Sequence, residues 1–290
     1  MTKPTYYIAS FSGGKDSTAM VLRLIELGEP LDEVRCCDTT AEFPAMYRHI
    51  EKVKDVVEAA GVKFTTLRPE HNFEYYLADV DVPNRKRDAK HYGVPGLGWP
   101  SPKTRWCTKH LKLELMKKHQ MELCEKYTVI QYVGIAADED YRMERKNNQG
   151  PDQRHPLRDW GWSEDDAMAY CKSKGYDWEG LYELFKNEKT GRARVSCWFC
   201  PLQPYDDLRK LRKHFPDLWG ELLRLDSRQW QTFSHGYSVA DLDKRFALED
   251  VLGGAGHSLK NRQFFTDLKR LLSGEATVDQ ILQEREQVTT

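Results

Sequence analysis

Six consecutive residues near the start of the chain have the composition of a polyphosphate-binding loop. Residues 12–17, Ser-Gly-Gly-Lys-Asp-Ser, follow a short β-rich run and precede an apolar run at helical spacing. Two glycines let the backbone approach an anion closely, and the first turn of a helix offers unpaired N–H groups and a positive dipole end. Lys15 adds a positive charge, and Ser12 and Ser17 add hydroxyl donors. The spacing differs from the Walker A pattern, which argues against ordinary γ-phosphate hydrolysis.

A second group of residues has the spacing of a metal or redox site. Cys197 and Cys200 are three positions apart, so two thiolates could bind a soft metal or act as a redox pair. Cys107 and His110 have the same spacing, and the four residues together would make an ordinary zinc set. We expect core packing for the remaining cysteines, which are Cys36, Cys37, Cys124 and Cys171.

Two acidic residues follow a run expected to be a strand. Asp138 and Glu139 come after residues 128–135, and open α/β sheets bind ligands at the carboxyl ends of their strands. A divalent ion could bridge these carboxylates to phosphates, and the alternative is a solvated acidic turn.

Alternating strand and helix patterns position these residues. Such an alternation predicts an α/β fold, in which helices cover both faces of a Rossmann-like, doubly wound and mainly parallel sheet. Beyond about residue 150 helical patterns dominate, so we expect a nucleotide-binding domain over residues 1–150 and a helical C-terminal annex over residues 151–290. The expected strands are residues 6–10, 33–37, 62–67 and 128–135, and the expected helices are residues 18–27, 46–60 and 111–127.

A glycine- and proline-rich region over residues 84–105 interrupts this alternation, and we interpret it as a long functional loop or lid. It contains the basic run 85–87, and bases could stack on Tyr92, Trp99 and Trp106. Further basic groups are either a positive rim for an anionic substrate or simply solvated helix faces; they are Lys109, Lys112, Lys117, Lys118, Arg209, Lys210, Arg212 and Lys213.

The composition excludes several classes of protein. The chain has 290 residues, 44 Lys and Arg against 45 Asp and Glu, and a net charge of −1, so it lacks the strongly basic field of a general nucleic-acid binder. The apolar runs are too short to span a membrane, and the N-terminus lacks the layout of a signal peptide. Seven cysteines argue for reduced thiols, and we expect a cytoplasmic protein without membrane association.

The chain resembles the PP-loop (adenine nucleotide α-hydrolase) superfamily, in particular the PAPS reductase-like family with its phage and bacterial members. The resemblance covers residues 6 to about 205. It is carried by residues 12–17, Cys37 to Pro44, Trp106-Cys107-Thr108, Gly134 to Glu139, His155-Pro156-Leu157 and Cys197 to Pro201.

The resemblance implies that the chain binds ATP with Mg²⁺ and cleaves its α–β bond. Lys15, Asp16 and Ser17 would then be catalytic. The implied nucleotide-binding residues are Ser12, Gly13, Gly14, Lys15, Asp16, Ser17, Asp38, Thr39, Gly134, Asp138 and Glu139. Ala136 stands where many relatives have arginine, and either Arg142 or Arg145 could supply that cation. The resemblance also implies that Cys107, Cys197 and Cys200 bind a [4Fe-4S] cluster with one open position; a structural Zn²⁺ with His110 as fourth ligand is the alternative.

The leading hypothesis is an AMP-forming sulfurtransferase that adenylates a substrate and then inserts sulfur. The acceptor would be a small molecule, tRNA or DNA, and a sulfur-donor protein is a possible partner. A sulfonucleotide (PAPS or APS) reductase is the main alternative, although the chain has no cysteine after Cys200 to act as the nucleophile. An adenylyltransferase without sulfur insertion and a non-catalytic nucleotide sensor are further alternatives.

Overall fold

The computed structural model describes residues 3–82, 91–144, 150, 152–191, 193–254 and 262–289. It consists of two compact units, which we describe separately. The first contains residues 1–76 and 103–198, and the second contains residues 77–102 and 199–290. These units divide the chain at other places than residue 150, because residues 152–198 belong to the first unit and residues 77–102 to the second.

The first unit is built on a sheet of five parallel strands in the order β3-β2-β1-β4-β5. The central strand is β1, where Ile8 and Ala9 are fully buried. The strand order reverses at β1, since β2 follows on one side and β4 pairs on the other. This is the switch point at which open α/β sheets form ligand sites. The strands are β1 Thr5–Phe11, β2 Glu33–Cys37, β3 Lys63–Leu67, β4 Thr128–Val133 and β5 Gln153–Arg154.

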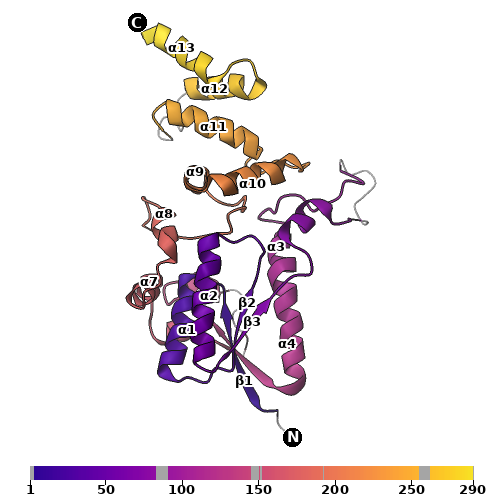
Figure 1. Cartoon of the computed structure of the whole chain (residues 1–290), viewed down its shortest axis with the longest axis vertical. Helices are drawn as coiled ribbons and strands as arrows, with labels where there is room; N and C mark the ends of the chain where they lie inside the picture. Colours follow the sequence, from indigo (N-terminus) through magenta and orange to yellow (C-terminus); the bar gives the residue numbers. More distant parts are fainter. Residues whose placement is uncertain are drawn as a thin grey trace. The chain divides into compact units, whose positions relative to one another are not determined.

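Helices lie on both faces of this sheet, with α1 and α2 on one side and α4 on the other (Figure 1). The expected α/β fold with a doubly wound parallel sheet is therefore confirmed. The helical segments of this unit are α1 Lys15–Leu27, α2 Pro44–Ala59, α3 Trp106–Thr108, η2 Lys109–Leu113, α4 Glu114–Lys126, α5 Asp140–Met143, α6 Pro156–Asp159, α7 Glu164–Ser173, η4 Trp178–Gly180 and α8 Leu181–Leu184; η1 Tyr75–Asp79 crosses the boundary between the units.

Local sequence signals explain where the helices near the site begin and end. Gly28 closes α1 in the left-handed conformation at φ 65°, which costs glycine no steric strain. Ser163 begins α7 with a capping box, in which its side chain and that of Asp166 satisfy each other's backbone N–H groups. These two helices pack against each other.

The second unit is helical in its C-terminal part, as expected for the annex. Its helices are α9 Tyr205–His214, α10 Pro216–Ser227, α11 Val239–Val251, α12 Arg262–Ser273 and α13 Val278–Thr289. The last three share an apolar core that includes Leu248, Phe264 and Ile281. No described helix combines the length and apolar character needed to cross a membrane.

Residues 91–105 of the glycine- and proline-rich region are described, and residues 91–102 among them belong to the second unit. A Cβ atom at Gly96 would lie 2.3 Å from the carbonyl oxygen of Leu77, so only glycine fits there. Trp99 is 1% exposed and donates its indole N–H to Asp226 at 2.8 Å. The expectation that bases stack on Trp99 is therefore wrong, because its ring belongs to the core. The basic run 85–87 lies outside the described residues.

Candidate functional site

The loop between β1 and α1 turns at two adjacent glycines, Gly13 and Gly14. Gly13 adopts φ 78°, a region that disfavours side chains, and a Cβ atom there would lie 2.8 Å from Sδ of Met46. Gly14 is the N-cap residue of α1 and has an extended backbone, and no side chain caps this end of the helix. Gly13 is therefore required by its backbone and by the side chains beside it, whereas a Cβ atom at Gly14 would make only ordinary van der Waals contacts.

Three backbone N–H groups of this loop remain without an acceptor. Within the loop, the N–H of Ser12 donates to Oγ of Ser17 at 3.1 Å, and that of Lys15 donates to the hydroxyl of Tyr182 at 3.0 Å. The N–H groups of Gly13, Asp16 and Ser17 have no acceptor among the described residues. Uncapped amides at a helix N-terminus attract phosphate, so the loop has free donors of the kind that an anion needs.

The side chain of Lys15 is buried beside this loop. Its ammonium lies 2.8 Å from Oδ1 of Asp16 and 2.8 Å from Oε2 of Glu164, and the residue is 7% exposed. Burial alone would lower the pKa of Lys15, but the two carboxylates outweigh it and raise the pKa above its usual value. Lys15 is thus a fixed positive charge at the N-terminus of α1.

The residue that follows β4 lies against the first turn of α1. A Cβ atom at Gly134 would lie 3.1 Å from the backbone nitrogen of Ser17, so glycine allows strand and helix to approach closely. Asp138 accepts the backbone N–H of Glu164 at 3.0 Å. Both side chains that we expected to face phosphates have protein partners, because Glu139 pairs with Arg142 at 2.7 Å. Arg145, the other cation considered, lies outside the described residues.

Asp38 and Thr39 follow β2 and are also held by protein groups. Asp38 accepts from the hydroxyl of Tyr47 at 3.0 Å and from the N–H of Thr40 at 2.8 Å. Thr39 is 2% exposed and donates to Glu42 at 2.8 Å. Asp38 therefore lies at the carboxyl edge of the sheet, where the predicted nucleotide pocket requires it.

The cysteines are all reduced, and they lie in different surroundings. Cys107 and Cys197 belong to the first unit and Cys200 to the second, and all three are partly exposed. The thiol of Cys197 donates to Oε1 of Glu42 at 3.4 Å. Among the described residues, no three His, Cys, Asp or Glu side chains are grouped closely enough to hold a metal ion.

Lys112 links two of these thiols. Burial alone would lower its pKa, but the nearby groups of Cys197, Glu42, Cys37 and Cys107 raise it. His110, the fourth ligand of the zinc alternative, hydrogen-bonds Glu114 through Nδ1 at 2.7 Å.

The four cysteines that are not ligand candidates differ in their burial. Cys36 and Cys171 are buried, which confirms core packing. Cys124 is exposed and Cys37 is half-buried, so core packing is wrong for the first and incomplete for the second. The reason is that α4 has no fully buried residue, so its side chains, Cys124 among them, remain partly or fully open to solvent.

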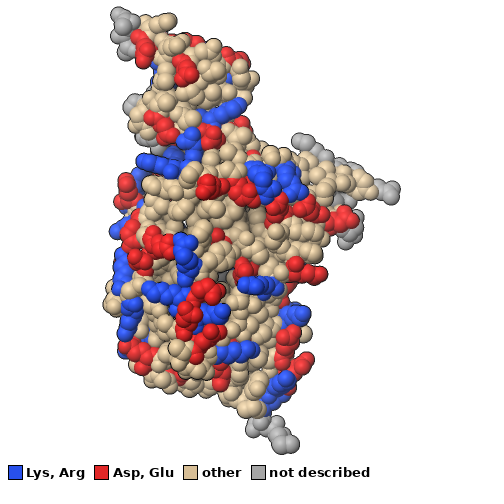
Figure 2. Space-filling model, in the orientation of Figure 1, with Lys and Arg blue, Asp and Glu red and all other residues tan. Residues whose placement is uncertain are grey.

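The basic groups on the helices of the second unit are largely paired. Arg209 binds the buried carboxylate of Glu249 at 2.6 Å, and Arg212 binds Asp243 at 2.7 Å. Figure 2 shows Lys and Arg interspersed with Asp and Glu over the visible face. Trp106 is 7% exposed, so base stacking on it is also wrong, whereas Tyr92 is 52% exposed.

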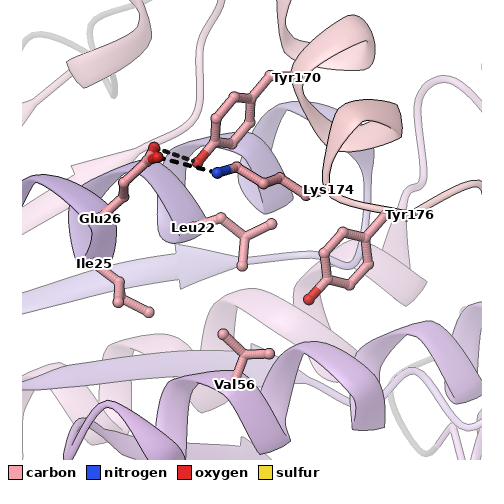
Figure 3. Close-up of a pocket in the computed structure, with 7 residues that line it drawn as sticks. All are labelled: Leu22, Ile25, Glu26, Val56, Tyr170, Lys174 and Tyr176. Carbon is pink, nitrogen blue, oxygen red and sulfur yellow. Dashed lines mark hydrogen bonds and ion pairs between the residues drawn. The ribbon is translucent and has the colours of Figure 1, made fainter.

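A shallow pocket on the first unit is separate from the phosphate loop. It has a volume of about 260 Å³ and is lined by Leu22, Ile25, Glu26, Val56, Tyr170, Lys174 and Tyr176. Figure 3 shows Tyr170 and Lys174 of the α7 region reaching the carboxylate of Glu26 on α1. Leu22 lies seven residues beyond Lys15, which is about 10 Å along a helix. The pocket is therefore not part of the predicted site.

Three residues at the loop were not anticipated from the sequence. Glu164 binds the ammonium of Lys15, Trp178 donates its indole N–H to the carbonyl of Gly13 at 2.7 Å, and Tyr182 accepts from Lys15. The sequence around Glu164 indicated only the start of a helix. No spacing rule connects Trp178 or Tyr182 with a loop about 165 residues earlier, because that contact depends on the tertiary fold.

A family model and a relative each match more than half of this chain. The model of the phosphoadenosine phosphosulfate reductase domain matches residues 6–202. An uncharacterized protein of Methanocaldococcus jannaschii is 30% identical over 218 residues, which cover 73% of this chain and 39% of that protein. The chain thus spans about two fifths of the length of this relative.

One solved structure matches this chain weakly. It is the U34-tRNA thiolase NcsA from Methanococcus maripaludis with its [4Fe-4S] cluster, at a TM-score of 0.36 and 14% identity, covering 77% of this chain and 70% of that chain. The family match extends from β1 through the phosphate loop to the Cys197–Cys200 pair. The chain therefore belongs to the phosphoadenosine phosphosulfate reductase domain family of the PP-loop superfamily.

Proposed function

We propose that this protein binds ATP at residues 12–17 and cleaves the bond between its α and β phosphates to adenylate a substrate. The observation that carries the proposal is the set of three unpaired amides, at Gly13, Asp16 and Ser17, beside the buried ammonium of Lys15. Amides and a cation directed at the same place are suited to stabilising a departing polyphosphate. Membership of a PP-loop family supports adenine nucleotide as the ligand.

In the proposed reaction, a substrate oxygen attacks the α-phosphorus, and pyrophosphate leaves with the electron pair of the α–β bond. A sulfur nucleophile then displaces AMP from the adenylated substrate, so that a carbon–sulfur bond replaces a carbon–oxygen bond. Lys15 and the loop amides would stabilise the leaving phosphates, and Mg²⁺ would neutralise their remaining charge. Asp38, Thr39 and Gly134 would bound the nucleotide at the ends of the strands.

The identity of the sulfur carrier is a separate part of the proposal. We propose Cys107, Cys197 and Cys200 as thiolate ligands of a [4Fe-4S] cluster, on the basis of their spacing, their reduced state and their partial exposure. Zn²⁺ with His110 in addition is the alternative, and it would have a structural role. The described residues do not bring three such donors together.

A sulfonucleotide reductase is the second candidate function, and the matched family model favours it by name. That reaction needs a cysteine to attack the sulfate sulfur. The last cysteine of these 290 residues is Cys200, and the phosphate loop keeps the Lys-Asp-Ser sequence that we associate with ATP-using members of the superfamily.

The experiment that tests the proposal follows labelled ATP under anaerobic conditions with Mg²⁺ and a panel of acceptors. The panel contains small metabolites, tRNA and DNA, each with and without a persulfide sulfur donor. We expect AMP and pyrophosphate with a productive acceptor. Release of ADP and phosphate would overturn the proposal, and release of sulfite from PAPS with a thiol reductant would favour the reductase.

A variant pair tests the role of the loop in that reaction. We expect Lys15→Ala to weaken ATP binding by at least about tenfold, because it removes the cation beside the loop amides. Lys174→Ala is the matched control, since this lysine is also ion-paired in the first unit but contacts Glu26 at the distant pocket. Equal affinity of Lys15→Ala and the parent would remove the loop from the proposed function.

A further inference from the structure

The phosphate loop is held from behind by a segment far away in the sequence. Within η4 and α8, Trp178 donates its indole N–H to the carbonyl oxygen of Gly13 at 2.7 Å, and Tyr182 accepts the N–H of Lys15 at 3.0 Å. The two aromatic residues are 2% and 6% exposed, so both hydrogen bonds are shielded from water. Their rings contact each other edge to face with centroids 4.8 Å apart.

The backbone of this segment is strained, and contacts with neighbouring residues hold it in that conformation. Trp178 and Glu179 have φ values of 51° and 54°, a region that is unusual for residues with side chains and most unusual for a bulky one. The ring of His49 packs on Trp178 at 4.5 Å, and Arg48 of α2 forms a two-pronged ion pair with Glu179. Strained residues persist where neighbours determine their conformation, often at functional sites.

The two hydrogen bonds satisfy two of the backbone polar groups of the loop. They occupy the carbonyl of Gly13 and the amide of Lys15, while the amides of Gly13, Asp16 and Ser17 remain without an acceptor among the described residues. A Cβ atom at Gly14 would lie 3.4 Å from the hydroxyl of Tyr182, so the loop also fits closely against this side chain.

We propose that Trp178 and Tyr182 are positioning residues of the phosphate loop: they fix it so that the amides of Gly13, Asp16 and Ser17, and not that of Lys15, bind the phosphate chain. This inference rests on the proposed function only in taking ATP as the ligand. It assigns to residues 178–182 a role in nucleotide binding. It also implies that the nucleotide site depends on the part of the first unit that extends to α8.

The experiment combines amide hydrogen exchange with a ligand series. Tyr182→Phe removes the acceptor of the Lys15 amide, and Trp178→Phe removes the donor to Gly13. Tyr170→Phe is the matched control, because it removes a hydroxyl that binds Glu26 in the same unit. Exchange at Lys15 is measured by NMR, and dissociation constants are measured for adenosine, AMP and a non-hydrolysable ATP analogue.

In the parent, we expect the Lys15 amide to be protected without ligand and the amides of Gly13, Asp16 and Ser17 to become protected only with the analogue. In Tyr182→Phe, Lys15 should lose protection, and the analogue should bind about threefold to tenfold more weakly, the effect of one hydrogen bond. Adenosine affinity should stay unchanged, which a merely structural defect would not produce. Tyr170→Phe should match the parent.

The outcomes separate the inference from the proposed function. A parent that does not bind the ATP analogue would refute ATP as the ligand, while Lys15 exchange would still report whether Tyr182 holds the loop. Parent-like analogue binding by Tyr182→Phe with an unprotected Lys15 would overturn the inference and leave the proposed function standing. An equal loss for adenosine and the analogue would also overturn it. If Trp178→Phe fails to fold, Tyr182→Phe decides.

Discussion

At the scale of single residues, Lys15 is balanced between two carboxylates rather than directed only at a ligand. Its ammonium lies 2.8 Å from both Asp16 and Glu164, and each of these interactions would compete with a bound phosphate. Asp16 is part of the loop itself. Glu164 comes from α7, so it is the partner that can be removed without altering the loop sequence.

We therefore expect Glu164→Gln to tighten the binding of metal-free ATP analogue by about threefold to tenfold, because it removes one negative charge near a polyanion. Calorimetric titration measures the effect. Glu26→Gln is the control, since Glu26 is also ion-paired to a lysine of the first unit, at 3.0 Å. Weaker binding by Glu164→Gln would mean that Glu164 supports the phosphate site instead of competing for Lys15.

His49 gives the first unit a dependence on pH. It is 5% exposed, its Nε2 lies 2.9 Å from Oγ1 of Thr18, and burial lowers its pKa to about 4. Between about pH 6.5, the ordinary pKa of histidine, and pH 4, the unfolded chain binds a proton that the folded chain does not. The free energy of unfolding should therefore fall as the pH falls through this window, by at most about 3 kcal/mol for this one group.

Urea unfolding at pH 7 and pH 5 measures this dependence. We expect His49→Gln to lower the stability at pH 7 and to flatten the decline toward pH 5. His214→Gln, which changes an exposed histidine of α9, should keep the decline of the parent. A parent and a His49→Gln variant with the same slope would show that His49 does not titrate differently in the folded state.

At the scale of elements, the contact between β4 and α1 determines the width of the site. Gly134 ends β4, and a Cβ atom there would lie 3.1 Å from both Cα and the backbone nitrogen of Ser17. Backbone atoms cannot move aside as the end of a side chain can. We expect Gly134→Ala to shift the first turn of α1, to cost about 1–3 kcal/mol of stability and to weaken the binding of the ATP analogue.

Gly220→Ala is the matched control for that change. Gly220 lies inside α10, it is exposed, and a Cβ atom there meets nothing within 4 Å. Alanine should therefore stabilise the chain by about 0.5–1 kcal/mol and leave nucleotide binding unchanged. Thermal unfolding and analogue titration check both variants. If Gly134→Ala bound the analogue as tightly as the parent, the close contact would not shape the site.

The elements that could be predicted from sequence are those with local signals. The expected strand at residues 33–37 is β2, and the expected helix at residues 46–60 corresponds to α2, because their signals are local, such as the helical periodicity and the Gly61 that follows it. The loop at residues 12–17 was recognisable for the same reason, since its glycines, lysine and hydroxyls are contiguous. The parallel sheet then followed from the alternation of strands and helices.

The features that could not be predicted depend on contacts between distant segments. Glu164 reaches the loop because α7 packs against α1, whereas Trp178 and Tyr182 come from η4 and α8, and η4 packs against α2. Asp138 was correctly predicted to follow a strand, but nothing in the sequence indicated that its carboxylate accepts the N–H of Glu164 at the start of α7. Trp99 was misinterpreted as a stacking surface because its burial against Asp226 is set by residues more than 120 positions away.

At the scale of the whole molecule, the described contacts of the loop all lie in the first unit, so the proposed nucleotide binding should not depend on the stability of the second. Asp226, which is 9% exposed, connects two segments of the second unit, because it accepts hydrogen bonds from Trp99 at 2.8 Å and from the N–H of Val239 at 2.7 Å.

In Asp226→Asn, the side-chain NH₂ group would face one of these two donors, so we expect the free energy of unfolding to fall by about 1–3 kcal/mol. Hydrogen exchange should become faster in residues 199–254 and stay unchanged in the phosphate loop, with parent-like affinity for the ATP analogue. Asp217→Asn, an exposed change in α10, should alter neither. Loss of analogue affinity in Asp226→Asn would mean that the second unit contributes to nucleotide binding, since the phosphate loop itself would be intact.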